Sequence, residues 1–285
     1  MRWLVTGATG MLGADLAALL AAEREDVAAL SRRDLDLCDP AAVLAAVRTE
    51  KPDVVVNCAA WTAVDDAETH EEEALSVNGH AVGPLAEACA RHGATLVHMS
   101  TDYVFDGTAR TPYAEDEPVA PVNAYGRTKA AGERAALRHG GYVVRTAWLY
   151  GAHGPNFVRT MVRLAAGHDT VRVVDDQRGQ PTWTGDLAAQ IVRLVRAQAP
   201  AGIYHGTNAG LTTWYGFARE IFRLLGADPD RVRPTNSRDF PRPARRPAYG
   251  VLGHDAWGRA GLAPMRDWRA ALRDAWPRLV AAKEL

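Results

Sequence analysis

The sequence has few cysteines, almost no net charge and no long apolar run, and each absence excludes a class of protein. Its 3 cysteines are too few for the disulfide framework of a small secreted domain. The 33 basic and 34 acidic side chains leave a formal net charge of −1, so no overall positive field attracts nucleic acid or anionic lipid. No segment has the roughly 20 apolar residues that a membrane-spanning helix requires. We therefore expect a cytoplasmic protein that binds neither nucleic acid nor membrane.

The cysteines are also too widely separated to suggest a metal site. Cys38, Cys58 and Cys89 share no metal-binding spacing, and free cysteine usually behaves as a small apolar side chain. We interpret all three as buried core residues and predict no metal.

What the sequence does have is length and a regular alternation of elements. Its 285 residues, 47% of them hydrophobic, are enough to bury a large core. Apolar runs at 3–6, 26–30, 54–56, 95–99 and 141–146 predict strands, and the segments 11–22, 40–50, 75–91 and 125–139 between them predict helices. This alternation predicts an α/β fold with a Rossmann-type doubly wound parallel sheet, spanning residues 1–150.

After residue 150 the predicted helices are shorter, and arginine and proline become more frequent. We expect residues 151–285 to form mainly a smaller α/β substrate-binding domain, from which the chain can return in part to the first. Helices are predicted at 156–166, 186–197 and 213–225, the last two capped by Thr184 and Thr213. Trp257, Trp268 and Trp276 are interpreted as packing residues or as surfaces for stacking a base.

Three glycines stand between the first predicted strand and its helix. Gly7 permits a tight turn, Gly10 lets the backbone approach a pyrophosphate, and Gly13 allows close packing of helix and strand. The spacing is Gly-x-x-Gly-x-x-Gly rather than the commoner Gly-x-Gly-x-x-Gly. The context of strand, turn and helix favours a dinucleotide site over an ordinary glycine-rich turn.

The end of the second predicted strand bears on the choice of cofactor. Many NAD sites place an acid there to bind the ribose hydroxyls, whereas this chain has Ser31 and Arg32. An arginine suits the 2′-phosphate of NADPH, although a solvated loop arginine is an alternative. Asp36 and Leu37 follow at positions where they can flank an adenine. We predict NADPH, with NADH possible as a second cofactor.

Tyr125 and Lys129 stand four residues apart on a predicted helix, a spacing that stacks two side chains on one face. A nearby ammonium favours the phenolate, and this would lower the pKa of the tyrosine toward the working range of an acid–base group. Thr101 follows the strand at 95–99, at the edge where parallel α/β sheets bind ligands. His98 lies within that strand and is interpreted as structural.

Taken in order, these motifs resemble the extended short-chain dehydrogenase/reductases and, more narrowly, the dTDP-4-dehydrorhamnose reductases. The resemblance covers nearly the whole chain. It is carried by NCAAWTAVD at 57–65, STDYVFDG at 100–107, PVNAYGRTK at 121–129 and RTAWLYG at 145–151, with QPT at 180–182 and ARRP at 244–247.

The resemblance implies a role for each matching residue. Tyr125 would protonate the substrate oxygen, Lys129 would hold the nicotinamide ribose, and Thr101 would hydrogen-bond the sugar carbonyl. With the glycine-turn and strand-end residues included, the predicted cofactor contacts are Gly7, Gly10, Met11, Leu12, Gly13, Arg32, Asp36, Leu37, Ala59, Ala60, Thr62, Tyr125 and Lys129. The predicted sugar contacts are Val64, Thr101, Asp102 and Trp148. Some members of the family dimerise around magnesium, but Asp15 stands here without a carboxylate set, so the choice between monomer and homodimer stays open.

The expected activity is NADPH-dependent reduction of the 4-keto group of a dTDP-4-keto-6-deoxy sugar, with dTDP-4-dehydro-L-rhamnose as the leading substrate. One alternative is a related dTDP-ketosugar from antibiotic sugar synthesis, and another is a non-catalytic NADP-binding regulatory subunit. A sugar 4,6-dehydratase is disfavoured because Tyr103, and not glutamate, follows Asp102. Arg242, Arg245 and Arg246, in a proline-rich stretch, are candidate diphosphate ligands or surface loop residues.

Overall fold

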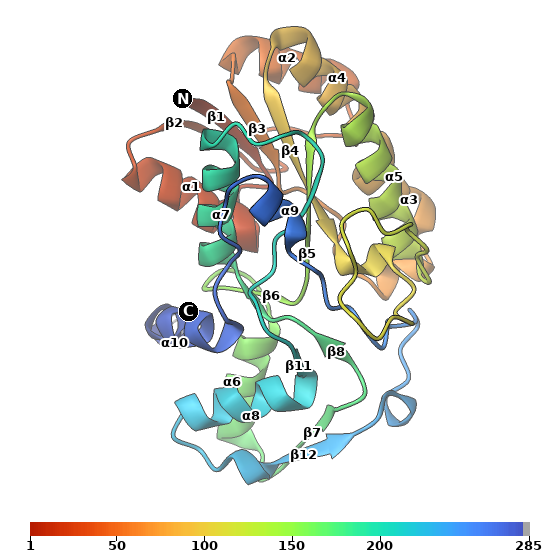
Figure 1. The fold of residues 1–285 in the computed structure, drawn as a ribbon, viewed down its shortest axis with the longest axis vertical. Coiled ribbons are helices and arrows are strands. Elements are labelled where there is room, and N and C mark those ends of the chain that lie inside the picture. Colours follow the sequence, from red (N-terminus) through yellow and green to blue (C-terminus); the bar gives the residue numbers. More distant parts are fainter. Residues whose placement is uncertain (282–285) are drawn as a thin grey trace.

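A six-stranded parallel sheet forms the centre of the molecule, in a computed structural model that describes residues 1–281. The strand order is β10-β5-β4-β3-β1-β2 (Figure 1), and every neighbouring pair is parallel. The strands are β1 (Arg2–Thr6), β2 (Asp26–Leu30), β3 (Val54–Asn57), β4 (Thr95–Thr101), β5 (Tyr142–Thr146) and β10 (Ile203–His205). The predicted Rossmann-type α/β fold is confirmed. The division of the chain at residue 150 stays a prediction.

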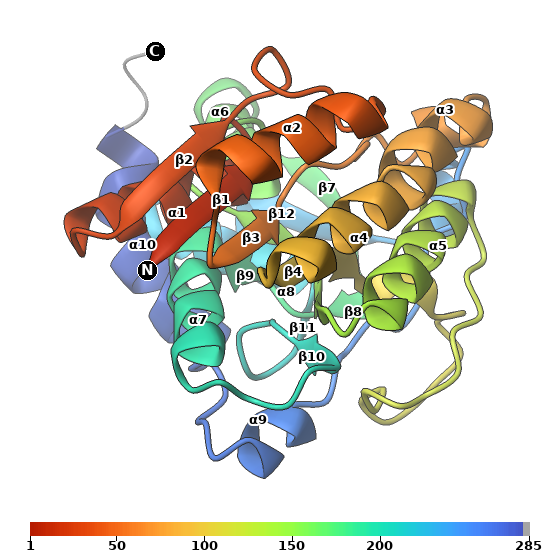
Figure 2. The same ribbon diagram turned by 90° about the horizontal axis from the view of Figure 1, so that it is seen from above.

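Helices cover both faces of this sheet (Figure 2). On one face lie α2 (Pro40–Glu50), α4 (Val82–His92) and α5 (Ala124–Arg138), and on the other α1 (Met11–Ala22) and α7 (Thr184–Arg196). Because both faces are covered, the strands can be apolar throughout, as the unbroken run Val54–Val56 illustrates. This is the arrangement in which ligands bind beyond the carboxyl ends of the strands.

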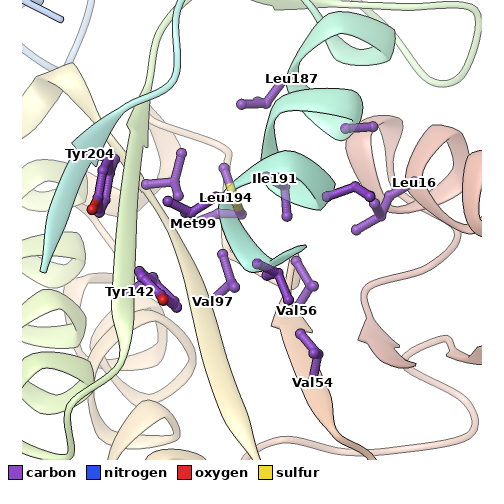
Figure 3. Packing of buried hydrophobic residues seen from close by; sticks show 14 of the residues in the cluster. Leu16, Val54, Val56, Val97, Met99, Tyr142, Leu187, Ile191, Leu194 and Tyr204 are labelled. Atoms are coloured by element: carbon purple, nitrogen blue, oxygen red, sulfur yellow. The ribbon is translucent and has the colours of Figure 1, made fainter. Parts of the chain in front are cut away.

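The core on the α1/α7 face is built from side chains of these two helices and of the sheet strands beneath them (Figure 3). Leu16 of α1 and Ile191 of α7 are fully buried, as are Val56 and Val97 of the sheet. Burying one such side chain stabilises the fold by roughly 1.5–3 kcal/mol. The resulting rigid sheet fixes the strand ends from which the site residues extend.

Helix α5 lies unusually close to its neighbours because of two glycines. A Cβ on Gly126 would come 2.1 Å from the carbonyl oxygen of Tyr103, and one on Gly132 would come 2.2 Å from that of Asn78. The helix begins after Asn123, whose side chain accepts a hydrogen bond from the Gly126 amide at 2.8 Å. The two glycines therefore determine how closely the helix packs, and the Asn123 cap determines where it begins.

The remaining elements form a smaller layer below the carboxyl edge of the sheet (Figure 1). Helices α6 (Phe157–Gly167), α8 (Trp214–Leu224) and α10 (Trp268–Ala281) share one apolar cluster. Three short strand pairs accompany them: β7 (Val171–Val174) with β12 (Val232–Thr235), β6 (Leu149–Tyr150) with β9 (Thr182–Trp183), and β8 (Arg178–Gly179) with β11 (Thr212–Thr213). The short helices α3 (Glu71–Leu75) and α9 (Asp255–Arg259) complete the fold. No described helix has the length and apolar character needed to cross a membrane.

Three expectations need correction. The helix predicted at 75–91 is divided: α3 is followed by a π-helix at Ser76–His80 and then by α4. Thr184 does not cap α7 but is its first residue, and its hydroxyl donates to Asp15; the cap at Thr213 is confirmed. Of the three cysteines expected to be buried, Cys89 is buried and Cys58 is half-buried, but Cys38 is exposed. Of the two interpretations of the tryptophans, packing is confirmed for Trp257 and Trp268, which are fully buried.

Candidate functional site

The three glycines form a tight turn at the carboxyl edge of the sheet. Gly7 has a φ of 64°, a conformation that side chains other than glycine rarely adopt, and a Cβ there would lie 2.7 Å from the Ala59 amide nitrogen. A Cβ on Gly13 would lie 2.3 Å from the carbonyl oxygen of Gly7. Glycine is therefore required for the turn, α1 and the end of β3 to meet.

The first turn of α1 is suited to an anion. Its N-cap residue, Gly10, has no side chain to bond the free amides, and no acidic residue stands in the first turn. Unpaired N–H groups and the positive end of the helix dipole attract phosphate. Met11 is half-buried there, whereas the Leu12 side chain is buried in the core, so only its backbone is available. The residues present fit a dinucleotide pyrophosphate.

The end of β3 lies directly beside this turn. Ala59 and Ala60 are half-buried, Thr62 is exposed and Val64 is half-buried. Since Gly7 packs against Ala59, the structure brings these predicted residues together with the glycine turn.

The loop after β2 differs from expectation. Asp34 turns back to the strand end and accepts hydrogen bonds from the Ser31 backbone amide at 2.8 Å and hydroxyl at 2.6 Å. These two bonds hold the pKa of the Asp34 carboxyl below its usual value. An acid therefore does contact the strand end, and the sequence interpretation missed it because Asp34 stands three residues beyond Ser31. Arg32 and Asp36 are exposed, while Leu37 is buried.

Thr101, Asp102 and Tyr125 lie together at the end of β4 and form the candidate reactive cluster. The Thr101 hydroxyl donates to Asp102 Oδ1 at 3.0 Å and accepts from the Tyr103 amide at 3.1 Å. The Asp102 carboxyl is 3% exposed, and this burial raises its pKa to about 7. A Cβ on Gly250 would come 2.4 Å from Asp102 Oδ2, so the chain after β12 closes over the carboxyl.

Tyr125 does not have the lowered pKa that the sequence suggested. Burial and the neighbouring Asp102 raise the pKa of its phenol, and a hydrogen bond with Thr101 opposes them only in part. Its ring meets that of Tyr103 edge to face, with centroids 5.9 Å apart. Tyr125 is thus held in its protonated form, as a proton donor must be.

Lys129 lies one turn further along α5 and is 2% exposed. Burial lowers the pKa of its amine to about 8, although the Glu133 carboxylate acts in the opposite direction. Its Nζ lies 3.5 Å from Nε2 of His98. The histidine that we interpreted as structural is therefore in contact with the predicted catalytic lysine.

Trp148 is displayed on a strained turn after β5. Its φ is 47°, which is uncommon for a bulky residue and costs about 1–3 kcal/mol. The indole stacks on Trp214 with ring centroids 3.6 Å apart, and a Cβ on Gly179 would come 2.5 Å from it. The surrounding chain therefore enforces this position of the half-buried ring.

The proline-rich loop at 241–247 approaches the same edge. Arg246 forms an ion pair with Asp65, its Nη1 lying 3.0 Å from Oδ1, and its guanidinium lies 5.9 Å from the centre of the Tyr103 ring. Arg242 lies 3.9 Å from the same Asp65 carboxylate, and Arg245 is exposed. Of the three candidate phosphate ligands, Arg246 is thus the one that faces the ring of Tyr103, which in turn packs against Tyr125.

The sequence interpretation missed the buried groups that support α5. Arg145 of β5 donates two hydrogen bonds of 2.8 Å to Glu133, which also accepts from Ser100 at 2.6 Å. Asn78 of the π-helix bonds the Trp61 backbone and the Thr128 hydroxyl. Glu133 stands four residues after Lys129, so a third position on the same helical face was the available signal.

No group of three or more metal-ligating side chains comes together within residues 1–281. Asp15 accepts a hydrogen bond from the Thr184 hydroxyl, and His153 Nε2 lies 3.7 Å from its other oxygen.

The parallel sheet, the glycine turn at α1 and the Tyr–Lys pair beside Thr101 define an extended short-chain dehydrogenase/reductase. Residues 1–280 match the family described as "RmlD substrate binding domain". The chain therefore belongs to this family.

Individual relatives agree over almost their full lengths. A dTDP-4-dehydrorhamnose reductase of Streptomyces griseus is 58% identical, with 98% of this chain and 94% of the relative covered. A probable dTDP-4,6-dihydroxy-2-methyloxan-3-one 4-ketoreductase of Streptomyces antibioticus is also 58% identical, covering 99% and 97%. A solved dTDP-4-dehydrorhamnose reductase of Bacillus anthracis, in complex with NADP, has a TM-score of 0.93 at 35% identity, covering 97% and 98%.

Proposed function

We propose that this protein uses NADPH to reduce the 4-keto group of a dTDP-4-keto-6-deoxy sugar, with dTDP-4-dehydro-L-rhamnose as the leading substrate. The observation that carries the proposal is the cluster of Thr101, Tyr125 and Lys129 at the carboxyl edge of the sheet, next to the glycine turn. The relative with bound NADP supports the choice of cofactor.

In this proposal the chain binds the cofactor with the first turn of α1 and with the segment after β3. When bound, the cofactor supplies the hydride that goes to C4. Tyr125 gives its phenolic proton to O4, so that the ketone becomes a hydroxyl. Lys129 binds the nicotinamide ribose, and its ammonium stabilises the phenolate that is left. Thr101, held by Asp102, positions O4 as charge develops on it.

The sugar and its diphosphate are assigned to the carboxyl edge of the sheet and the smaller layer beside it. Val64, Asp102 and Trp148 are proposed to line the sugar pocket, and Arg246, with Arg242 and Arg245 nearby, to bind the diphosphate. We propose that residues 151–285 form mainly this substrate domain. The protein acts as a monomer or homodimer and has no nucleic-acid partner.

Which ketosugar is used is the open part of the proposal, because two relatives at the same identity are named for different substrates. A reductase of a related dTDP-ketosugar is therefore the second candidate. The deciding experiment is NADPH oxidation with a panel of enzymatically generated dTDP-ketosugars. We expect turnover with at least one, and the fastest identifies the substrate.

Two outcomes would overturn the proposal. Absence of turnover with every ketosugar, together with a stoichiometric partner enzyme on purification, would favour a regulatory subunit. Release of a 4-keto-6-deoxy sugar from dTDP-glucose with NAD would indicate a dehydratase. We expect neither, because burial raises the pKa of the Tyr103 phenol, and Tyr103 stands where a dehydratase needs a carboxylate base.

A further inference from the structure

A chain of four buried polar side chains runs under the reactive cluster. The Thr6 hydroxyl donates to Asn57 Oδ1 at 2.7 Å, Asn57 Nδ2 lies 3.2 Å from His98 Nδ1, and His98 Nε2 lies 3.5 Å from Lys129 Nζ. All four residues are at most 2% exposed. The chain thus leads from the end of β1, through β3 and β4, to the lysine on α5.

The orientation of the Asn57 amide is fixed by the backbone. The Ala59 amide nitrogen, which can only donate, bonds Asn57 Oδ1 at 3.2 Å. Turning the amide over would place two donors together at that point. The Nδ2 group of Asn57 therefore faces His98 and donates to its Nδ1.

This orientation determines the tautomer of His98. A neutral imidazole has one donor and one acceptor nitrogen, so if Nδ1 accepts from Asn57, the hydrogen lies on Nε2. An imidazolium would again put two donors together at Nδ1, and burial together with Lys129 also lowers the pKa of His98. The N–H on Nε2 consequently points at Nζ of Lys129.

An N–H facing Nζ can donate to a neutral amine but opposes an ammonium. We propose that Asn57 and His98 are positioning residues for Lys129: Asn57 holds His98 as its Nε2–H tautomer, and that N–H favours the neutral amine over the ammonium. The close approach is possible because Gly132 has no side chain; a Cβ there would lie 2.9 Å from His98 Nε2.

Other groups facing Lys129 act in the opposite direction. Glu133 on α5 and Cys58 after β3 both favour the ammonium, and Tyr125 lies one turn away on α5. His98 differs from these groups, because the direction of its N–H disfavours the ammonium of Lys129. The pair Asn57–His98 therefore lowers the pH at which Lys129 loses its proton.

The first test needs no activity and does not depend on the proposed function. Histidine nitrogen NMR of the purified wild-type protein distinguishes the two tautomers, and the spectrum of His98→Gln identifies the His98 signal by its loss. We expect the unprotonated nitrogen of His98 to be Nδ1. An unprotonated Nε2 in the wild type would overturn the inference.

The second test uses an isosteric substitution to reverse the direction of the hydrogen bonds that His98 makes. In Asn57→Asp the carboxylate accepts from Nδ1–H, so His98 becomes the Nδ1–H tautomer and its Nε2 accepts from an ammonium. NMR should show this exchange of tautomer. In the kinetic arm, which rests on the proposed function, the pH at which kcat/KM falls on the alkaline side should rise by about one unit or more, since acceptors and opposite charges favour the ammonium.

Thr6→Val is the matched control. It also removes a buried partner of Asn57, but the Ala59 amide still fixes the amide orientation, so neither tautomer nor alkaline limb should move. An Asn57→Asp protein with the exchanged tautomer and an unmoved alkaline limb would overturn the role assigned to His98. If the wild-type protein turned over no ketosugar at all, that result would count against the proposed function alone.

Discussion

The two ends of the proposed cofactor site differ in how firmly the fold determines them. At the nicotinamide end, Thr101, Asp102 and Lys129 are almost fully buried, and each contacts a partner that the fold fixes. At the adenine end, Arg32 and Asp36 are exposed in the loop after β2. A buried polar group left without a partner costs about 1–3 kcal/mol, whereas an exposed ion pair contributes about 0–1 kcal/mol.

Substitutions at the two ends should therefore have different consequences. A change at the buried end alters chemistry, protonation and stability together, because every neighbour there depends on the residue replaced. A change at the exposed end can alter the preference between cofactors and leave the fold untouched. The predictions below test this contrast.

The largest effect is expected for Tyr125→Phe, which removes the transferable proton and keeps the ring that packs against Tyr103. General acid catalysis contributes about 10²–10⁴-fold, so kcat should fall by that range or more. Cofactor binding should remain. Rates with the best ketosugar and NADPH titration by fluorescence measure the two quantities.

Tyr103→Phe is the matched control, since it deletes a neighbouring phenol whose ring stands 5.9 Å from that of Tyr125. It should retain far more activity. Near-normal turnover by Tyr125→Phe would mean that the proton comes from another group.

An intermediate effect, on stability, is expected for Asp102→Asn. Burial raises the pKa of Asp102 from 3.8 to about 7, so over this range the folded protein keeps a proton that the unfolded chain has released. Stability is therefore unpenalised below about pH 4 and is lost as the pH rises to about 7, by up to roughly 4 kcal/mol. The Asp102→Asn protein has no carboxyl to titrate at this position. Its free energy of unfolding relative to that of the wild type should therefore increase across that pH interval.

Urea unfolding of both proteins at about pH 5 and pH 8 measures this difference. The comparison with wild type is needed because burial and Arg145 lower the pKa of His205 to about 3, which gives a pH dependence of opposite sign in both proteins. Parallel stability curves for the two proteins would show that Asp102 is ionised at neutral pH in the folded state.

The same contrast explains what could be predicted from the sequence. The glycine turn, the strand ends and the Tyr125–Lys129 helix follow from local rules, namely backbone conformation, apolar runs and helical spacing. The direction of the pKa shift at Tyr125 does not, because it depends on burial and on Asp102, which spacing along a helix cannot reveal. His98 was interpreted as structural because its contact with Lys129 joins two elements, β4 and α5, and such a contact is not visible in the local sequence.

The second half of the chain was harder to predict because its elements are short and depend on tertiary contacts. Strands of two residues such as β8 and β11 have no periodicity to detect. Thr184 is a residue type that often caps helices, yet its hydroxyl donates a hydrogen bond to Asp15, 169 positions earlier in the chain. Contacts of this kind are decided by the completed fold.

The smallest effect is expected at Arg32, where the sequence favoured recognition of the NADPH 2′-phosphate. Because Arg32 is exposed, its preference for NADPH should be about tenfold or less, as for other solvent-screened pairs. Arg32→Ala should lower the ratio of kcat/KM for NADPH to that for NADH by this amount, and Arg33→Ala, also exposed, should not. Asp34→Asn should raise the ratio, because the carboxylate that holds Ser31 repels a phosphate. If Arg32→Ala and Arg33→Ala leave the same ratio, Arg32 is only a solvated loop residue, and the choice between cofactors depends on the backbone and Asp34.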